Sequence, residues 1–285
     1  MFRIKVNATS ANLSVGFDVL GLALDFFNEF TFEYASEFKF KGFEKKYQTV
    51  DNNLVYDSYI KVFEKLNKKP IPVEIGFKGD VPVSRGLGSS STLIVAGVFG
   101  ANKILGDVLS KDELFEICAE IEGHPDNVAP AIYGSMVASF KYDGKFIPNI
   151  YPVSKDLKFM VIIPPFKLST AKAREVLPKT LSISDTVSNL SRIVNLPRAF
   201  ETGDVSMLKK LFLDKIHEPY RGTLIEGYDR LREICKDLDC VCAISGSGST
   251  MIVISKDYSN LDKFKELGYE IRKVNVGSGI EIWEE

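Results

Sequence analysis

The stretch VSRGLGSSST, residues 83–92, places Gly86 and Gly88 before four consecutive hydroxyl side chains. Glycine permits backbone angles and close approaches that other residues forbid, and the apolar run LIVAGVFGANKIL that follows indicates a helix. The first turn of a helix presents unpaired N–H groups and a partial positive charge, which suit a phosphate. Because one hydroxyl is enough to cap a helix, four of them predict extra ligands for phosphate or magnesium.

Three well-known motifs do not fit this stretch. A Walker loop needs a lysine where Ser89 stands, and a dinucleotide fingerprint needs a glycine where Ser91 stands. The glycine spacing of a nucleophile elbow is also missing. From this loop alone, a tight strand-to-helix turn with a polar cap remains an alternative.

A second glycine–serine loop, SGSGST at residues 245–250, joins two short apolar runs. Alone, it is typical of a flexible hairpin connection. Two such loops in one chain of this size suggest that they share an anionic ligand.

Composition limits the class of protein. The 285 residues are 45% hydrophobic and 26% charged with a net charge of −2, which indicates a globular protein of one large or two ordinary domains and argues against nucleic-acid binding. Four cysteines form no CxxC pair and only two histidines are present, which disfavours a soft-ligand metal site and favours reduced thiols in the cytoplasm. The start, MFRIKV, alternates like a strand rather than a signal peptide, and we expect no membrane segment.

Periodicity predicts an α+β fold in two domains, residues 1–153 and 154–285, because strands and helices mix without a βαβ rhythm. Ser110 and Glu113 have the spacing of a capping box, so a helix should begin there and end near Gly123. The proline-containing segment DGKFIPNIYP, residues 143–152, is the predicted boundary between domains. Strands are expected at residues 2–6, 29–34, 73–78, 136–141 and 159–163, and helices at 53–67, 185–201 (split or kinked at Pro197), 205–216 and 224–236.

Three groups of polar side chains lie in apolar surroundings, and a purely structural role remains an alternative to a functional one for each group. An Asx turn or a cap would explain the first group, helix capping the second, and surface pairing the third. The groups are Asn12 and Asp18 in TSANLSVGFD, then His124, Asp126 and Asn127 in HPDNVAPA, and lastly Arg174 and Arg221.

In order along the chain, SANLSVGFD, SRGLGSSST, EIEGHPDNVAP, STAKAREVLP, DKIHEPYRG and ISGSGST resemble the GHMP kinase superfamily and, within it, the homoserine kinases. The resemblance spans nearly the whole chain. It implies a ribosomal-S5-like amino-terminal domain with a left-handed crossover, a ferredoxin-like carboxy-terminal domain, and a cleft between them for ATP and substrate. It also implies a homodimer and ATP-dependent phosphorylation of L-homoserine to O-phospho-L-homoserine, a step of threonine biosynthesis.

The resemblance assigns roles residue by residue. Ser90 and Glu120 match the magnesium ligands, while Asn127 and Thr170 match residues near the reacting groups. The residues that match the amino-acid site are Asn12, Asp18, His124, Arg174 and Arg221. The segment that matches the ATP phosphate loop comprises Pro82, Val83, Ser84, Arg85, Gly86, Leu87, Gly88, Ser89, Ser90, Ser91 and Thr92.

If these roles hold, the two arginines grip the carboxylate of homoserine, Asp18 binds its ammonium and Asn12 adds an amide oxygen. No general base is assigned. Ser91 and Thr92 stand where the family often has two alanines, Ser249 stands where it often has proline, and SANLSVGFD replaces SANLGPGFD. A kinase for another small hydroxylated metabolite and a ligand-sensing protein without catalysis remain the alternatives.

Overall fold

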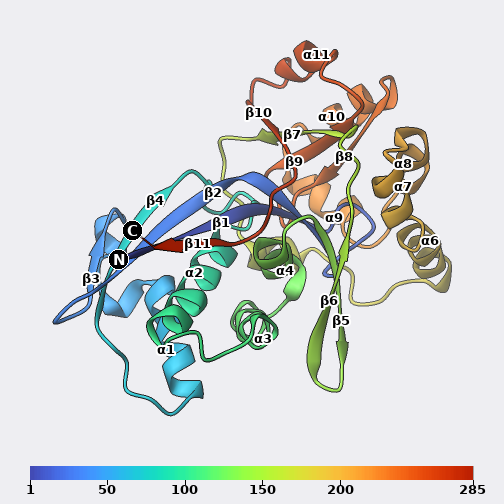
Figure 1. Ribbon diagram of the computed structural model, residues 1–285. Coiled ribbons are helices and arrows are strands. Elements are labelled where there is room, and N and C mark those ends of the chain that lie inside the picture. The colour runs from blue at the N-terminus through green and yellow to red at the C-terminus, as the bar shows by residue number, and fades with distance from the viewer. Residues whose placement is uncertain (285) are drawn as a thin grey trace.

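Two β-sheets, each with its own helices, meet along a shared apolar layer in this computed structural model, which describes residues 1–284 (Figure 1). The α+β class predicted from the sequence is confirmed. Within residues 1–284, no helix has the length and apolar content that crossing a bilayer requires.

The first sheet has seven strands in the order β11-β1-β2-β4-β3, with β5 pairing to the start of β2 and β6 pairing to β5. All its pairs are antiparallel except β3 with β4. The strands are β1 (Phe2–Ala11), β2 (Leu20–Tyr34), β3 (Lys39–Lys41), β4 (Val73–Gly79), β5 (Met136–Tyr142), β6 (Lys145–Tyr151) and β11 (Glu281–Glu284).

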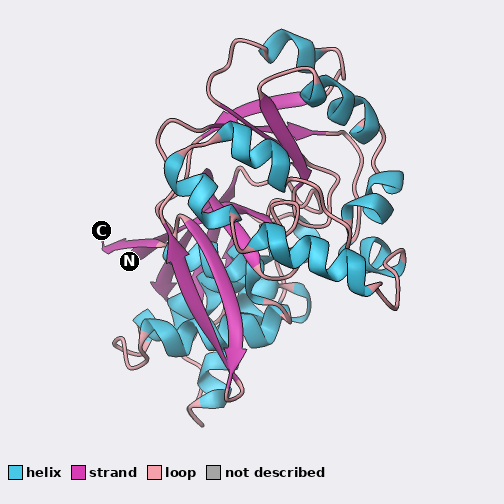
Figure 2. Cartoon of the chain, turned by 90° about the vertical axis from the view of Figure 1, so that its right-hand side faces the viewer, coloured by secondary structure: helices cyan, strands magenta, loops and turns pink. Residues whose placement is uncertain are grey.

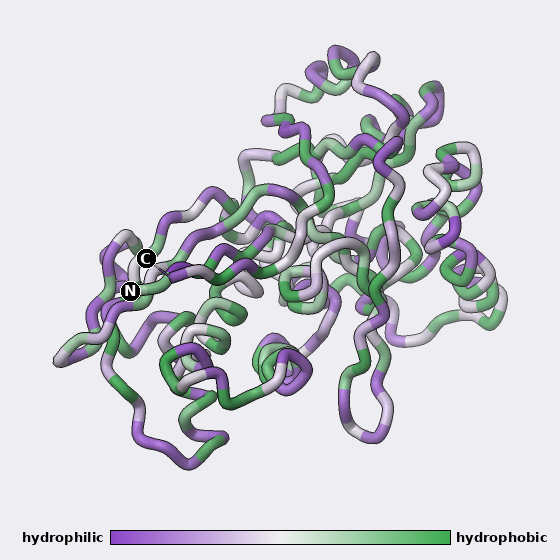
Figure 3. The backbone as a smooth tube through the Cα atoms, in the orientation of Figure 1, coloured by the Kyte–Doolittle hydropathy of each residue, from purple (hydrophilic) through white to green (hydrophobic). Residues whose placement is uncertain are grey.

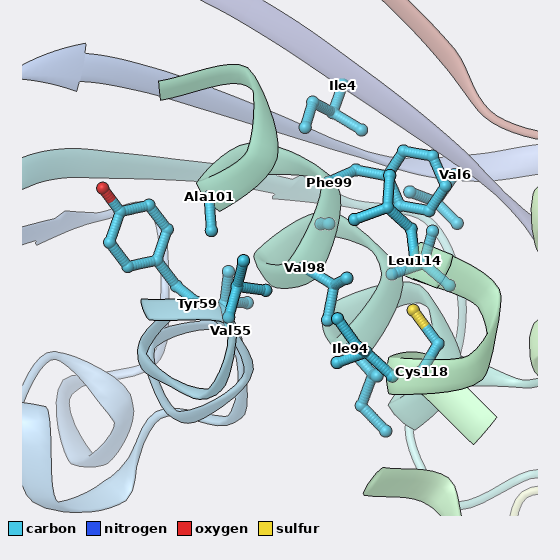
Figure 4. Close-up of a cluster of buried hydrophobic side chains, with 14 of the residues drawn as sticks. Ile4, Val6, Val55, Tyr59, Ile94, Val98, Phe99, Ala101, Leu114 and Cys118 are labelled. Carbon is cyan, nitrogen blue, oxygen red and sulfur yellow. The ribbon is translucent and has the colours of Figure 1, made fainter. Parts of the chain in front are cut away.

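Four helices cover one face of this sheet: α1 (Leu54–Lys65), α2 (Ser89–Ile104), α3 (Lys111–Glu122) and α4 (Pro125–Tyr133). Figure 4 shows apolar side chains of α1, α2 and α3 meeting those of β1 in one core, to which Val128 and Ile132 of α4 also belong. Helix α2 is central in this core, and α1 packs closely on it at Gly97, where a Cβ atom would lie 2.3 Å from the carbonyl oxygen of Val55. Short 3-10 helices at Lys45–Tyr47 and Val50–Asn52 lead into α1.

The second sheet is antiparallel in the order β10-β7-β9-β8. Figure 2 shows it on the side of the molecule opposite to helices α1–α4. Its strands are β7 (Lys158–Ile163), β8 (Cys240–Ile244), β9 (Met251–Ser255) and β10 (Glu270–Val274). Its helices are α5 (Thr170–Glu175), α6 (Ile183–Ile193), α7 (Leu196–Thr202), α8 (Val205–Leu211), α9 (Glu218–Arg221), α10 (Tyr228–Lys236) and α11 (Leu261–Lys265), with a 3-10 turn at Gly222–Leu224.

The shared apolar layer fixes the two sheets relative to each other. Ala8 and Leu22 of the first sheet belong to the same buried cluster as Val161 and Ile252 of the second. In Figure 3, α2 is mostly green, the hydrophobic end of the scale, whereas the turn between β5 and β6 is purple. Burying the apolar layer between the two sheets stabilises the seam along which the candidate site residues gather.

The segment 143–152, the predicted domain boundary, contains the strand β6 (Lys145–Tyr151). Pro148 is tolerated there since β6 lies at a sheet edge and pairs only with β5. Pro197 does separate α6 from α7, as predicted. The helix expected at 205–216 ends earlier, at Leu211. The domain division at 153/154 stays a prediction, and β11 adds the last strand to the first sheet.

Candidate active site

A cavity of about 530 Å³ lies where the two sheets meet, and most of the predicted site residues line it. One end is formed by the glycine-rich loop and the start of α2, and the other by the turn after β1 with α5 and α9. Of the predicted residues, the cavity is lined by Asn12, Asp18, Val83, Ser84, Arg85, Gly86, Gly88, Ser89, Ser90, His124, Asn127, Thr170, Arg174 and Arg221.

The two glycine–serine loops touch each other through their backbones. Ser245 Oγ donates to the carbonyl oxygen of Gly86 at 2.7 Å, and Thr250 N donates to that of Arg85 at 3.0 Å. A Cβ atom at Gly86 would lie 2.1 Å from Ser245 O, and one at Gly88 would lie 2.0 Å from Thr9 Oγ1. Both glycines also have positive φ angles, of 73° and 68°. No larger residue fits either position.

Helix α2 begins at Ser89 without a side-chain cap, because its N-cap residue is Gly88. The N–H groups of its first turn therefore face the cavity end of the helix without a capping side chain. Other predicted loop residues have structural roles instead. Leu87 is buried in the apolar layer, and Thr92 Oγ1 accepts a hydrogen bond from Asn28 Nδ2 at 2.8 Å.

The carboxylate beside the loop is Glu122, whereas Glu120, the acid predicted from the sequence, does not line the cavity. Ser90 Oγ and Ser91 Oγ donate to Glu122 Oε1 at 2.9 and 3.0 Å. Glu120 instead pairs with Lys65 Nζ at 3.1 Å on the exposed surface. Two residues along a helix correspond to a rotation of about 200°, so Glu120 and Glu122 point to opposite sides of α3. Helix α3 does begin with the predicted capping box and end at Gly123.

The HPDN segment begins a new helix. His124 is the N-cap residue of α4, and its Nδ1 atom lies 2.6 Å from Asp126 Oδ1. This hydrogen bond is the main reason that the pKa of His124 is raised. Asn127 Oδ1 accepts from Thr9 Oγ1 at 2.8 Å. Asp126 lines the cavity as well, although the sequence interpretation gave it no role.

At the other end of the cavity, Asp18 and Arg174 form a two-pronged ion pair with N–O distances of 2.9 and 3.0 Å. Their side chains are 34% and 38% exposed. Asn12 stabilises the same turn, because its Nδ2 atom donates to Gly246 O and its Oδ1 atom accepts from Asp18 N. The sequence interpretation had given Asp18 and Arg174 separate partners.

Arg221 is a buried cation without a carboxylate partner among residues 1–284. The residue is 2% exposed, and its Nε and Nη1 atoms donate to the carbonyl oxygens of Ala173 and Gly246, each at 3.1 Å. Burial, with the nearby charge of Arg174, lowers the pKa of Arg221 to about 10. The Phe17 ring lies beside both guanidinium groups, with its centre 5.0 Å from Arg221 Cζ and 5.7 Å from Arg174 Cζ. An anionic ligand would supply the missing charge.

Thr170 is the first residue of α5, and its Oγ1 atom lies 3.4 Å from Ser247 Oγ of the second loop. Ser249 stands where the family often has proline, and it still anchors this loop, since Ser249 Oγ donates to Phe166 O at 2.6 Å. A further part of the cavity, away from Thr170, is lined by apolar side chains that the sequence did not single out: Phe43, Tyr47, Leu54, Phe77 and Leu93.

A fully buried acid, Glu218, lies on α9 one turn before Arg221. Its Oε1 atom accepts from Ile244 N at 2.9 Å, and its Oε2 atom accepts from Ser14 Oγ at 3.0 Å. Burial, and secondarily the charge of Asp214, raises the pKa of Glu218 to about 7. No sequence signal identified this residue, because glutamate side chains are rarely buried.

With this geometry described, comparison with known proteins gives the class. The family of GHMP kinases N terminal domains matches residues 53–135, and that of GHMP kinases C terminal domains matches residues 197–266, together more than half of the chain. The chain is therefore a GHMP kinase. Phosphomevalonate kinase of Streptococcus pneumoniae, 15% identical with a TM-score of 0.72 over 97% of this chain and 99% of its own, shares the fold.

Relatives of higher sequence identity show which family of GHMP kinases the chain belongs to. Homoserine kinase of Clostridium botulinum (strain 657 / Type Ba4) is 40% identical over 97% of this chain and 96% of its own, and that of Clostridium beijerinckii is 43% identical over 93% and 91%. A crystal structure of homoserine kinase from Cytophaga hutchinsonii has a TM-score of 0.88 at 28% identity, covering 99% of this chain and 97% of its own. The chain belongs to the homoserine kinase family.

The buried acid makes stability depend on pH. Because the pKa of Glu218 is higher in the folded chain than the ordinary 4.5, its contribution to stability is complete below about pH 4.5 and is lost as pH rises through about 7. We expect Glu218→Gln, which cannot ionise, to lack this loss. The difference in unfolding free energy between wild type and variant should change by up to about 3 kcal/mol between pH 5 and pH 8, in favour of the variant at pH 8. Urea unfolding at both pH values measures it, and parallel pH profiles would contradict the assignment.

Proposed function

We propose that this chain transfers the γ-phosphoryl group of ATP to the hydroxyl group of L-homoserine, giving O-phospho-L-homoserine for threonine biosynthesis. The observation that carries the proposal is one cavity with two chemically different ends. The first has an uncapped helix start, serine hydroxyls and Glu122. The second has Asp18, Arg174 and the buried, unpaired Arg221. Membership of the homoserine kinase family agrees with this assignment.

The nucleotide would occupy the first end of the cavity. The residues Val83–Ser90 and the first turn of α2 would hold the phosphates, because free N–H groups at a helix start bind anions. The apolar lining beside them, with Tyr47 and Phe77, offers a surface for the purine base. The side chains of Ser91 and Thr92 are buried, so they would support the loop from behind rather than contact ATP.

The residues beside the loop fit a magnesium ion. Ser90 Oγ and Glu122 Oε1 are 2.9 Å apart, and both are hard oxygen donors. Within residues 1–284, no three acidic, histidine or cysteine side chains gather around a common point, but magnesium commonly takes only one or two carboxylates together with phosphate oxygens. When bound, the ion would neutralise charge on the phosphates during transfer. We propose Ser90 and Glu122 as its protein ligands.

The amino acid would occupy the second end. Arg221 would pair with its carboxylate, supplying the anion that this buried cation lacks. A zwitterion also matches the Asp18–Arg174 pair, because its ammonium can replace Arg174 beside Asp18 while its carboxylate replaces Asp18 beside Arg174. Asn12 would then act mainly through the turn that presents Asp18. A substrate with a carboxylate but no ammonium would draw Arg174 away from Asp18 without replacing its charge, which disfavours such hydroxylated acids as substrates.

The reacting hydroxyl would lie between the two ends, near Thr170, Asn127 and His124. Phosphoryl transfer passes through a loose transition state, so holding the hydroxyl in line and neutralising charge supply most of the rate. Asp18 is paired in the structure and is better suited to the ammonium than to proton abstraction. We assign no side-chain base.

Two wider features belong to the same proposal. A cytoplasmic location suits the four free cysteines, none of which forms a disulfide within residues 1–284. A homodimer remains an expectation from the family resemblance.

Substitution of the two acids of α3, Glu120 and Glu122, should affect activity differently. Glu122→Gln should lower kcat about a hundredfold, since losing a charge contact to the transferring phosphates costs roughly 3 kcal/mol. Glu120→Gln, on the opposite side of the helix, is the matched control and should stay within about threefold of wild type. Steady-state kinetics with saturating ATP and homoserine measure both values. A larger loss in Glu120→Gln than in Glu122→Gln would instead support Glu120 as the magnesium ligand.

The buried arginine should determine recognition of the carboxylate. Arg221→Leu should lower kcat/KM for L-homoserine at least about thirtyfold, because removing one partner of a buried charge pair costs roughly 2–5 kcal/mol. The dissociation constant of ATP should change little. Arg198→Leu is the control, since Arg198 is 74% exposed and pairs with Glu201. Homoserine amide should be a poor substrate for wild type and little worse for the variant; equal losses on acid and amide would make Arg221 structural.

A further inference from the structure

The turn that carries Asp18 has an unusual backbone. Asn12, Leu13 and Ser14 have φ angles of 74°, 43° and 64°, although none of them is glycine. Such angles cost free energy for residues with a Cβ atom and persist only where the surroundings impose them. Contacts from outside the turn must therefore hold it in place.

Helix α9 supplies these contacts at Ser14. The hydroxyl of Ser14 donates to Glu218 Oε2 at 3.0 Å, and its carbonyl oxygen lies 2.8 Å from His217 Nε2. Because a carbonyl oxygen only accepts, His217 Nε2 must carry the proton. Both residues are buried, so these bonds are shielded from water. His217, the N-cap residue of α9, and Glu218, its first residue, thus bind both oxygen atoms of Ser14.

Helix α9 is itself fixed from behind. Asp214 Oδ2 accepts from the backbone N–H groups of His217 and Glu218 at 2.7 and 2.8 Å, and its Oδ1 atom accepts from Asn189 Nδ2 at 2.7 Å. Glu218 also accepts from Ile244 N at the end of β8. The carboxylate of Glu218 therefore joins the turn after β1, in the first sheet, to α9 and β8 of the second part.

This joint lies directly behind the charged end of the cavity. Arg221 follows Glu218 by three residues on α9, and Asp18 follows Ser14 by four in the turn. Phe17 lies between the turn and α9, because its ring centre is 5.2 Å from that of His217 and 5.0 Å from Arg221 Cζ. A shift of α9 relative to the turn would change the separation between Asp18 and Arg221.

We infer that Glu218 is a positioning residue, which holds the Asn12–Asp18 turn against α9 and so sets the distance between the groups for the ammonium and the carboxylate of the amino acid. The effect on catalysis rests on the proposed function, whereas the effect on the turn does not. Glu218 does not touch the cavity itself, because only Arg221 of α9 lines it.

Glu218→Leu and Glu218→Gln separate this role from mere filling of space. Leucine leaves the Ser14 hydroxyl and the Ile244 N–H buried without partners, whereas glutamine can accept from Ile244 N and donate to Ser14 Oγ. We expect Glu218→Leu to lower kcat/KM for homoserine at least about tenfold with the KM for ATP within about threefold. Glu218→Gln should keep both values within about threefold of wild type. A loss in the glutamine variant as large as in the leucine variant would overturn the inference.

Hydrogen exchange gives a readout that does not depend on the substrate. Backbone amides of the Asn12–Asp18 turn should exchange faster in Glu218→Leu than in wild type, and Glu218→Gln should resemble wild type. Phe264→Leu, in the buried core under α11, is the control for general loss of stability and should change neither the turn nor the kinetic constants for homoserine. Unchanged exchange in the turn of Glu218→Leu would overturn the inference even if homoserine proved not to be the substrate.

Ser14→Ala provides a second variant in case the leucine variant fails to fold. Alanine keeps the Cβ atom and the same backbone strain, so only the bond to Glu218 is lost. We expect turn exchange to increase and kcat/KM for homoserine to fall about three- to tenfold, with ATP binding unchanged. Wild-type values for both readouts in Ser14→Ala would contradict the role of this bond.

Discussion

The direct contact between the two glycine–serine loops is the constraint on which the site depends. Gly86 and Ser245 approach so closely that a side chain at residue 86 would overlap the second loop. The contact holds the start of α2 at the seam with the second sheet. Together with the shared apolar layer, it keeps the first turn of α2 and Arg221 of α9 in the lining of one cavity.

Without a substrate, not every charged side chain at the second end of the cavity has an oppositely charged partner. Asp18 and Arg174 neutralise each other in a partly exposed pair, which is worth little by itself in water. Arg221 is buried and has only carbonyl oxygens as partners. The site thus carries one cation more than its carboxylates compensate. A zwitterionic amino acid would leave this net charge unchanged, but its carboxylate would give Arg221 a charged partner and its ammonium would lie beside Asp18.

The sequence predicted the parts of the site whose position follows from local rules. The capping box at Ser110, the glycine loop before α2 and the split at Pro197 all depend on residues close in the chain. The choice between Glu120 and Glu122 could not be made in this way, because a shift of two residues rotates a carboxylate to the other side of a helix. The Asp18–Arg174 pair and the Glu218–Ser14 bond join residues 156 and 204 positions apart, and only the packed fold reveals them. That most of segment 143–152 forms a strand was not predicted, because an edge strand accepts a proline.

In the proposed complex, homoserine lies in this cavity with its hydroxyl toward Ser90 and Glu122 and its carboxylate toward Arg221. Paramagnetic relaxation of homoserine protons tests it directly, with Mn²⁺ in place of Mg²⁺ and a non-hydrolysable ATP analogue bound. We expect the protons next to the hydroxyl to relax much faster than the α-proton, and Glu122→Gln to weaken the effect. Equal relaxation of both sets of protons, or faster relaxation of the α-proton, would contradict it.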